Sequence, residues 1–341
     1  MSFATLPSQL PPQRGARLQQ FLDLGWPHRK LEAWRYTDLA PLAKRDWALP
    51  DLPADDSSLA VDARDHFALL NSALATTAAA GDAVAEHTQV HTQGRDIVAA
   101  GQTNTQVLRR AGQIDGLRSH WQTLDVARDA TAHRVWVSDP QGNGHDLSRL
   151  TVTVAEGATL NLVVVHLGRA ITRLELDIHL QGPRSAAHLH VLSLPAAGAF
   201  DLPVKVHHEA PQAISRLTLR AIGLANTRSS VNGHIKVYEG ATKTDSEQHM
   251  ASLLLSPKAE INAKPDLEIY NDDVKCAHGS SFGQLNDDAL FYLRARGLNE
   301  SVARGMLTQA FAEQVLAQIG DEALREQLTT TLLQRLNEAS P

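Results

Sequence analysis

The sequence predicts a mainly β protein in which a solenoid core lies between helical N-terminal and C-terminal parts. Short segments with period-2 alternation of apolar and polar residues recur from about residue 135 to residue 285. Glycine, proline, asparagine or aspartate residues separate these segments. Apolar residues at helical spacing occur before and after this region. The three observations together divide the chain into three parts.

Residues 1–135 are predicted to form an N-terminal helical and irregular region. The segment "RGARLQQFLDLGWP" places Leu18 and Phe21 at helical spacing, with Gly25 as a stop signal. The Ala-rich segment 65–87, "DHFALLNSALATTAAAGDAVAEH", has apolar spacing that suits a helix or a short turn-rich segment. We therefore expect helices here, with irregular connections between them.

Residues 136–285 are predicted to form the β core. From residue 174 onward, strand starts are 13 to 18 residues apart, at Leu174, Leu189, Val204, Leu217, Ile235, Leu253 and Leu267. A sandwich or barrel usually has closer turn signals and hairpin dipeptides, and Asn-Gly occurs once, at 232–233. Two strands per coil would give a coil of about 30 residues, which favours a solenoid over a sandwich or barrel.

Residues 286–341 are predicted to form a C-terminal helical domain. "NDDALFYLRARGL" begins with Asn286 or Asp287 as the N-cap and ends at Gly297. In the next helix an apolar stripe runs from Val302 to Ile319, and in the last one leucines 324, 328, 332 and 336 are spaced four apart. Packing between these helices is the preferred interpretation, and a small helical pair can also dock a partner.

Composition and charge exclude several classes of protein. The chain has 341 residues, 43% hydrophobic and 21% charged, with a formal net charge of -6, which is typical of soluble globular proteins. An acidic chain offers no general attraction for nucleic acid or an anionic membrane, and no apolar run is long enough for a membrane span. A single cysteine and no apolar export signal lead us to expect a cytoplasmic protein. P-loop, dinucleotide-binding and common hydrolase motifs are all missing.

Cys276 and His278, in "NDDVKCAHGSSFG", are the candidate metal-binding residues. Positions i and i+2 of a strand point to the same face, with α carbons roughly 6.5–7 Å apart, so one metal ion can lie between thiolate and imidazole. Two ligands do not complete a metal site, however, and a second molecule would have to supply the others. The competing interpretations are a buried structural thiol, which residue types alone favour, and a Cys–His nucleophile pair.

Other histidines and carboxylates are interpreted as structural. "HLH" at 188–190 and "HH" at 207–208 have no cysteine or carboxylate at ligand spacing in the sequence. Asp272 and Asp273 follow Asn271, and we expect them to bond backbone groups in a turn.

The C-terminal sequence closely resembles the SufD-like subunits of the SufB/SufD family, which belong to the Suf system of iron–sulfur cluster assembly. Gln248, "LLLS" (253–256), "KPDLEIYNDDVKCAHG" (264–279), "GQL" (283–285) and "LFYLRARG" (290–297) carry the resemblance. "KLEAWRYTDL" (30–39) and "FALLNSAL" (67–74) resemble the opening segments of the family. The Cys-x-His-Gly motif at 276–279 favours SufD over its paralogue SufB. In the family a Thr-Val pair often follows this motif, whereas Ser280 and Ser281 follow it here.

This resemblance implies a right-handed parallel β-helix and a set of partners. A SufB-like paralogue would pair with the β-helix to form a heterodimer, and a SufC-like ABC ATPase would dock on the C-terminal helical domain. Isolated, the chain could form a homodimer. It would be a non-catalytic scaffold that supports iron delivery. A transient iron or iron–sulfur cluster would be shared with SufB near His278 and Cys276, and none would bind stably to this chain alone. The alternatives are a β-solenoid enzyme acting on polysaccharide and a binding module without metal chemistry.

Overall fold

The structure is a computed structural model that describes residues 3–44, 62–77 and 91–339. It contains the helices α1 (Pro12–Leu24), α2 (His66–Leu74), α3 (Asp287–Ala295), α4 (Glu300–Leu316) and α5 (Glu322–Ala339). Four short 3₁₀ helices lie near the N-terminus, at Phe3–Thr5, Pro7–Gln9, Glu32–Trp34 and Ala40–Lys44. The strands are β1 (Thr76–Thr77), β2 (His91–Val98), β3 (Thr103–Gln113), β4 (Leu117–Val126), β5 (Thr131–Gln141), β6 (His145–Val154), β7 (Thr159–His166), β8 (Ile171–Leu180), β9 (Ala186–Ser193), β10 (Ala199–His208), β11 (Ile214–Gly223), β12 (Arg228–Val237), β13 (Asp245–Leu254), β14 (Glu260–Ile269) and β15 (Lys275–Gly283).

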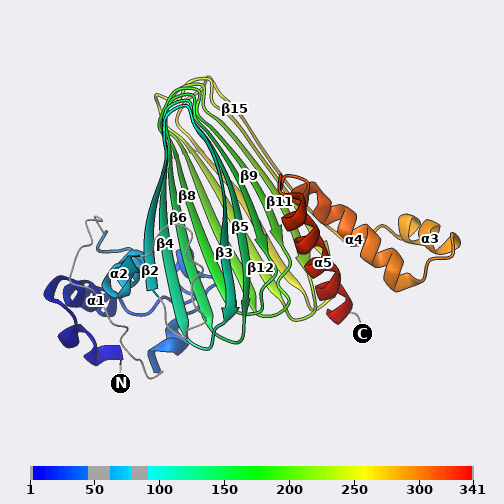
Figure 1. Cartoon of the computed structure of the whole chain (residues 1–341), viewed down its shortest axis with the longest axis horizontal. Coiled ribbons are helices and arrows are strands. Elements are labelled where there is room, and N and C mark those ends of the chain that lie inside the picture. The colour runs from blue at the N-terminus through cyan, green and yellow to red at the C-terminus, as the bar shows by residue number, and fades with distance from the viewer. Residues whose placement is uncertain (1–2, 45–61, 78–90, 340–341) are drawn as a thin grey trace.

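The strands form two parallel sheets, and the chain alternates between them. Even-numbered strands, together with β1, form an eight-stranded sheet in the order β1-β2-β4-β6-β8-β10-β12-β14, and odd-numbered strands form a seven-stranded sheet in the order β15-β13-β11-β9-β7-β5-β3. From β2 onward, each strand therefore pairs with the strand two positions away in sequence, one coil later, whereas β1 pairs with β2. Coils span 26 to 32 residues, as the pairs His145–Ile171 and Arg228–Glu260 show. The predicted solenoid is confirmed (Figure 1).

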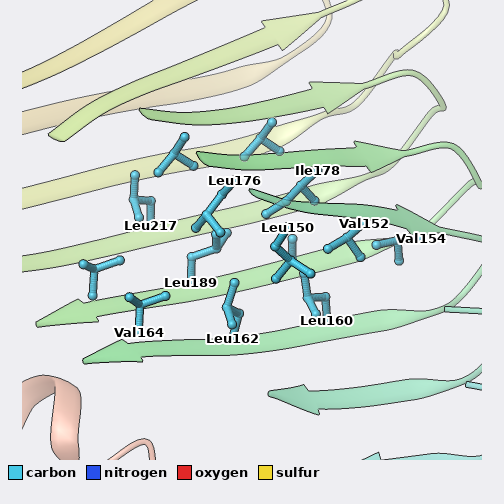
Figure 2. Packing of buried hydrophobic residues seen from close by; sticks show 14 of the residues in the cluster. Leu150, Val152, Val154, Leu160, Leu162, Val164, Leu176, Ile178, Leu189 and Leu217 are labelled. Carbon is cyan, nitrogen blue, oxygen red and sulfur yellow. The ribbon is translucent and has the colours of Figure 1, made fainter. Parts of the chain in front are cut away.

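The core of the solenoid lies between the two sheets and is built from alternate residues of each strand. Leu150, Val152 and Val154 of β6 point inward toward Leu160 and Leu162 of β7 (Figure 2). Identical parity in successive coils stacks these side chains into apolar rows, because a side-chain period of 2 keeps every second residue on one face. This stacking explains the alternation seen in the sequence.

The Asn-Gly pair at 232–233 does not form a hairpin turn but lies in the middle of β12. Gly233 faces the interior, where a Cβ atom would overlap Oε1 of Gln248 and lie 2.7 Å from Cε of Met250. The missing Cβ atom therefore leaves room for these two side chains inside the solenoid.

Strand β2 of the solenoid begins at His91, so the predicted boundary at residue 136 lies inside the β core. Strands β2, β3 and β4 precede this boundary. Strand β3 has little apolar alternation, because most of its side chains are exposed or half-buried. The pattern that identifies later strands is therefore missing from this one.

The N-terminal helices pack on the outer face of the eight-stranded sheet. Helices α1 and α2 lie where they were predicted, although the remainder of the Ala-rich segment, 78–87, is outside the described residues. Their buried apolar side chains form one cluster with Leu117, Trp121 and Leu147 of β4 and β6. The guanidinium of Arg173 lies over the ring of Trp34, with its Cζ atom 4.3 Å from the ring centroid. These contacts extend from β4 to β8 on the outer face of this sheet, with α1 and α2 beside its first strands (Figure 1).

The C-terminal helices pack on the outer face of the seven-stranded sheet. Leu324, Leu328, Leu332 and Leu336 of α5 are buried in a cluster with valines and leucines of β5, β7 and β9. The C-terminal helices therefore pack on the sheet as well as on each other, because both contribute apolar side chains to the same cluster. Helix α3 and the first half of α4 project away from the solenoid (Figure 1). None of the described helices is long and apolar enough to span a membrane.

Candidate functional site

The last coil of the solenoid, formed by β14 and β15, has no further coil over it. In the described part of the chain, β14 is the edge of the eight-stranded sheet and β15 is the edge of the seven-stranded one. Inward-facing side chains of this coil contact the core but are only partly buried, namely Ile261, Ala263, Leu267, Val274 and Cys276. The equivalent residues of the preceding coils are buried almost completely. The end of the solenoid is therefore an apolar surface bordered by two strand edges.

Cys276 and His278 lie on this open end and share one face of β15. In the parallel register Cys276 is paired with Ser246, and His278 is paired with Gln248. Ser246 and Gln248 are both buried inside the solenoid, which places Cys276 and His278 on the interior-facing side. The predicted common face is confirmed. Cys276 is half-buried and His278 is exposed, because no following coil covers them.

The thiol of Cys276 is not activated as a nucleophile in the free chain. Burial raises the pKa of this thiol, and the negative charge of Asp245 raises it further. A hydrogen bond from the backbone N–H of Ser246 offsets only part of this effect. Since the thiolate is the nucleophile and the metal ligand, a nearby positive charge or a metal ion would favour loss of the Cys276 proton.

Three hydrogen-bonded polar side chains lie inside the solenoid, and the last of them belongs to the residue paired with Cys276 in the parallel register. Nε2 of His208 lies 2.8 Å from Oγ of Ser215, which in turn lies 2.8 Å from Oγ of Ser246. Ser246 is the register partner of Cys276. Burial lowers the pKa of His208 to about 4, with the charge of Arg216 as a further cause. This histidine is therefore neutral inside the solenoid at pH 7.

The turn before β15 is held by Asn271. Its side-chain oxygen accepts a 2.9 Å hydrogen bond from the backbone N–H of Asp273, and its Nδ2 donates to the carbonyl oxygen of Glu239. The carbonyl oxygen of Asp273 accepts from the backbone N–H of Lys243. The turn expected at this position is present, but the side chain that bonds its backbone is that of Asn271 and not those of Asp272 and Asp273.

The two histidine pairs differ in the faces of the strands that they occupy and in their neighbours. His188 and His190 are outward and half-buried on β9, consistent with a structural role. His207 and His208 point to opposite faces of β10: His208 faces the interior, and His207 faces outward beside Asp177 and His179 of β8. The carboxylate beside His207 was not predicted from the sequence. The signal that could have found it is the coil length, which puts His207 directly opposite His179 in the neighbouring strand.

Within the cluster formed by Asp177, His179 and His207, hydrogen bonds shift the pKa values of Asp177 and His179. The pKa of His179 rises to about 9, chiefly because of its hydrogen bond to Asp177; burial opposes this rise, and a hydrogen bond to Glu209 adds to it. Burial of Asp177 would raise its pKa, but hydrogen bonds from both histidines hold that pKa below its ordinary range.

The projecting C-terminal helices carry a second uncovered apolar surface. Phe291 and Tyr292 of α3 are 75% and 57% exposed, and Val302 and Met306 of α4 are 45% and 47% exposed. Asn286 caps α3 as predicted, accepting a 2.9 Å hydrogen bond from the N–H of Ala289. The first half of the predicted α4 stripe is thus uncovered, and only its second half packs on the sheet.

Comparison with known proteins connects this architecture to iron–sulfur cluster assembly. A family model described as "SUF system FeS cluster assembly, SufBD core domain" matches residues 97–311, which contain the solenoid from the end of β2 onward. The iron-sulfur cluster assembly protein SufD of Escherichia coli K12 is 33% identical over 215 residues, which are 63% of this chain and 51% of that protein.

Two further relatives come from photosynthetic organisms. An iron-sulfur cluster assembly SufBD family protein of Synechocystis sp. is 31% identical over 195 residues, or 56% of this chain and 43% of that protein. The chloroplastic protein ABCI7 of Arabidopsis thaliana is 32% identical over 168 residues, or 49% of this chain and 35% of that protein. The chain thus matches about half or less of the length of these curated relatives.

Proposed function

The chain belongs to the SufBD family of the Suf iron–sulfur cluster assembly system, and on this premise we propose that it is a SufD-type scaffold subunit. It takes part in cluster assembly without performing catalysis itself. A SufB-like paralogue pairs with its solenoid, and a SufC-like ATPase docks on its C-terminal helices. The E. coli relative is named as a SufD assembly protein, and the Cys-x-His-Gly motif agrees with that subtype.

The observation that carries this proposal is the uncovered last coil. Its inward-facing side chains are apolar and partly exposed, and the outer edges of β14 and β15 carry backbone N–H and C=O groups available for pairing. A second solenoid can add its own strands to these edges and cover the apolar end. A SufB-like chain is the natural occupant, and the isolated chain uses the same surface to form a homodimer.

Cys276 and His278 then lie where the two solenoids meet. A thiolate and an imidazole can share one iron ion or one iron of a cluster, but further ligands must come from the partner. The iron or cluster is cargo that is built and passed on, so it is held transiently at the interface. A cation at this position also favours the thiolate form of Cys276. Without a cation, burial raises the pKa of the thiol and favours the protonated form.

The exposed apolar surface on α3 and α4 supports a separate partner. Phe291, Tyr292, Val302 and Met306 form an uncovered group on helices that project from the solenoid (Figure 1). An amphipathic helical surface of this kind is a common docking mode. We assign it to the SufC-like ATPase, because the open end is needed for the paralogue. The polysaccharide-enzyme alternative has no support from the three relatives described above, none of which is named as an enzyme acting on polysaccharide.

Co-expression with SufB-like and SufC-like chains from the same organism tests this function. We expect all three chains to co-purify as one complex. Ile261→Glu, which places a charge on the open end, should release the SufB-like chain and retain the SufC-like one. Ile97→Glu is the matched control, because Ile97 is 60% exposed on β2 at the opposite end of the sheet. A free chain in the presence of both partners would contradict the proposal.

A further inference from the structure

A group of two imidazoles and one carboxylate lies on the outer face of the eight-stranded sheet, away from Cys276. Asp177 and His179 alternate outward on β8, and His207 lies outward on β10, directly opposite His179 in the parallel register. Successive strands of a sheet are roughly 4.7–4.9 Å apart, so the two histidine rings stack face to face. Their centroids are 4.5 Å apart, and their planes differ by 6°.

The donor atoms converge on one point. Nε2 of His207 lies 3.1 Å from Oδ1 of Asp177, and Nε2 of His179 lies 3.5 Å from the same oxygen. One donor atom from each of the three residues lies within 4.8 Å of the others. Two donors bound to a single zinc ion at about 2.0–2.1 Å must lie roughly 3 Å apart. The three groups therefore need only small side-chain rotations to share one ion.

The other nitrogen of each ring is already held by a neighbouring side chain. Nδ1 of His179 lies 2.6 Å from Oε1 of Glu209, and Nδ1 of His207 lies 3.3 Å from the hydroxyl of Tyr238. In metal sites the ligating histidine almost always uses its second nitrogen in this way, which fixes the ring and directs the first nitrogen at the metal. This arrangement is an observation independent of the spacing of the three donors.

The surroundings leave the site open on one side. The side chains of Asp177, His179 and His207 are 34%, 27% and 16% exposed, and the interior-facing neighbours Ile178 and Val206 form a fully buried floor. Lys205 is the register partner of Asp177 and is exposed to solvent. Its flexible side chain can therefore extend into solvent when an ion is bound at Asp177.

We propose that Asp177, His179 and His207 bind one divalent first-row transition-metal ion. Two imidazoles and one carboxylate are donors typical of zinc and of non-haem ferrous iron, and they differ from the all-oxygen sets that suit calcium and magnesium. Three protein ligands leave at least one coordination position for solvent. Glu209 and Tyr238 are positioning residues, since each acts on the metal only through a histidine ring. The site does not depend on the proposed scaffold function or on any partner.

Zinc titration of the full chain by isothermal calorimetry tests the proposal, with cobalt absorption as a second readout. The parent chain should bind one equivalent of zinc that His179→Ala, His207→Ala and Asp177→Asn each lose. His190→Ala is the matched control, because His190 is also an outward-facing histidine on a solenoid strand, but in the other sheet. Circular dichroism verifies that each variant keeps its fold.

The positioning residues provide a graded second test. Glu209→Gln and Tyr238→Phe should weaken zinc binding by about 10- to 100-fold, as removal of such partners does elsewhere. Cobalt bound to the parent should give visible absorption that zinc displaces, and His207→Ala should abolish it. Equal zinc stoichiometry and affinity in the parent chain and in His207→Ala would overturn the proposal, since any binding would then belong to other histidines.

Discussion

At the scale of single residues, His278 and Cys276 differ in what the fold does to them. His278 is exposed at the open end, and its removal leaves no cavity in the core. Cys276 contacts the core, is half-buried, and has a raised thiol pKa. A histidine in this position is free to bind a metal ion, whereas the cysteine also contributes to packing. The two residues should therefore respond differently to substitution.

His278→Ala should reduce cluster formation by the three-chain complex at least several-fold without lowering the thermal stability of the free chain. Cys276→Ser should have a milder effect on cluster formation, because its role in packing is the larger one. Reconstitution with iron and sulfide, followed by absorbance, measures both. His249→Ala is the control, since His249 is exposed on the opposite face of the neighbouring strand β13. Parent-like cluster yield with His278→Ala would remove this histidine from the mechanism.

At the scale of elements, the turns between strands pack against the preceding coil. Gly182 lies between β8 and β9, where a Cβ atom would overlap the backbone of Ala155 and Glu156. Backbone atoms cannot move away as a flexible side chain would. Gly182→Ala should therefore destabilise the chain by about 1–3 kcal/mol, the usual range for overpacking.

Urea unfolding measures the effect of Gly182→Ala. Gly240→Ala is the control, because a Cβ atom there would meet no atom within 4 Å. Equal unfolding midpoints for the two variants would show that the coils are not packed as closely as the structure has them.

The C-terminal helices divide into a structural half and an exposed half. Leu328 of α5 is 3% exposed and packs on the seven-stranded sheet, whereas Met306 of α4 is 47% exposed. Leu328→Ala should cost about 2–5 kcal/mol of stability, as deletion of a buried leucine side chain usually does. Met306→Asp should leave the melting temperature nearly unchanged but weaken binding of the SufC-like ATPase, which calorimetry measures. Unchanged ATPase affinity would place the docking surface elsewhere.

At the scale of the whole molecule, buried histidines make the fold sensitive to acid. Burial is the main cause that lowers the pKa of His91, His120, His166 and His208 to about 4, 3, 3 and 4 respectively. In the unfolded chain these groups bind protons below their ordinary pKa of 6.5. In the folded chain they do not bind protons until about pH 4 or below. The unfolded state thus takes up more protons as the pH falls, and the free energy of unfolding decreases.

Each of these four histidines should remove about 2 kcal/mol of stability between pH 6.5 and pH 5. His179 affects the free energy of unfolding in the opposite direction, because its pKa is raised in the folded chain. Its stabilising contribution is complete below pH 6.5 and is lost as the pH rises through about 9. Urea unfolding at pH 7, 6 and 5 measures the slope, and His166→Gln should make it shallower. A free energy of unfolding that stays constant from pH 7 to pH 5 would contradict this account.

How much of this molecule could be predicted from its sequence depends on which pattern each part carries. Strands such as β6 and β8 alternate cleanly because they face a dry core on one side and solvent on the other. Strand β3 could not be recognised, since most of its residues are polar and exposed. The common face of Cys276 and His278 followed from strand parity alone. The cluster around Asp177 was not predicted, because it depends on the exact coil length, which sets the register between β8 and β10.

The central claim is that a partner solenoid covers the open end of this one, and the single cysteine offers a direct measurement of it. Cys276 is the only thiol in the chain and lies at that end, half-buried. Its alkylation rate can be followed by intact mass spectrometry in the dilute monomer and in the complex with the SufB-like chain. We predict at least a tenfold slower reaction in the complex. Equal rates in the two states would contradict the claim, because the last coil would then remain uncovered.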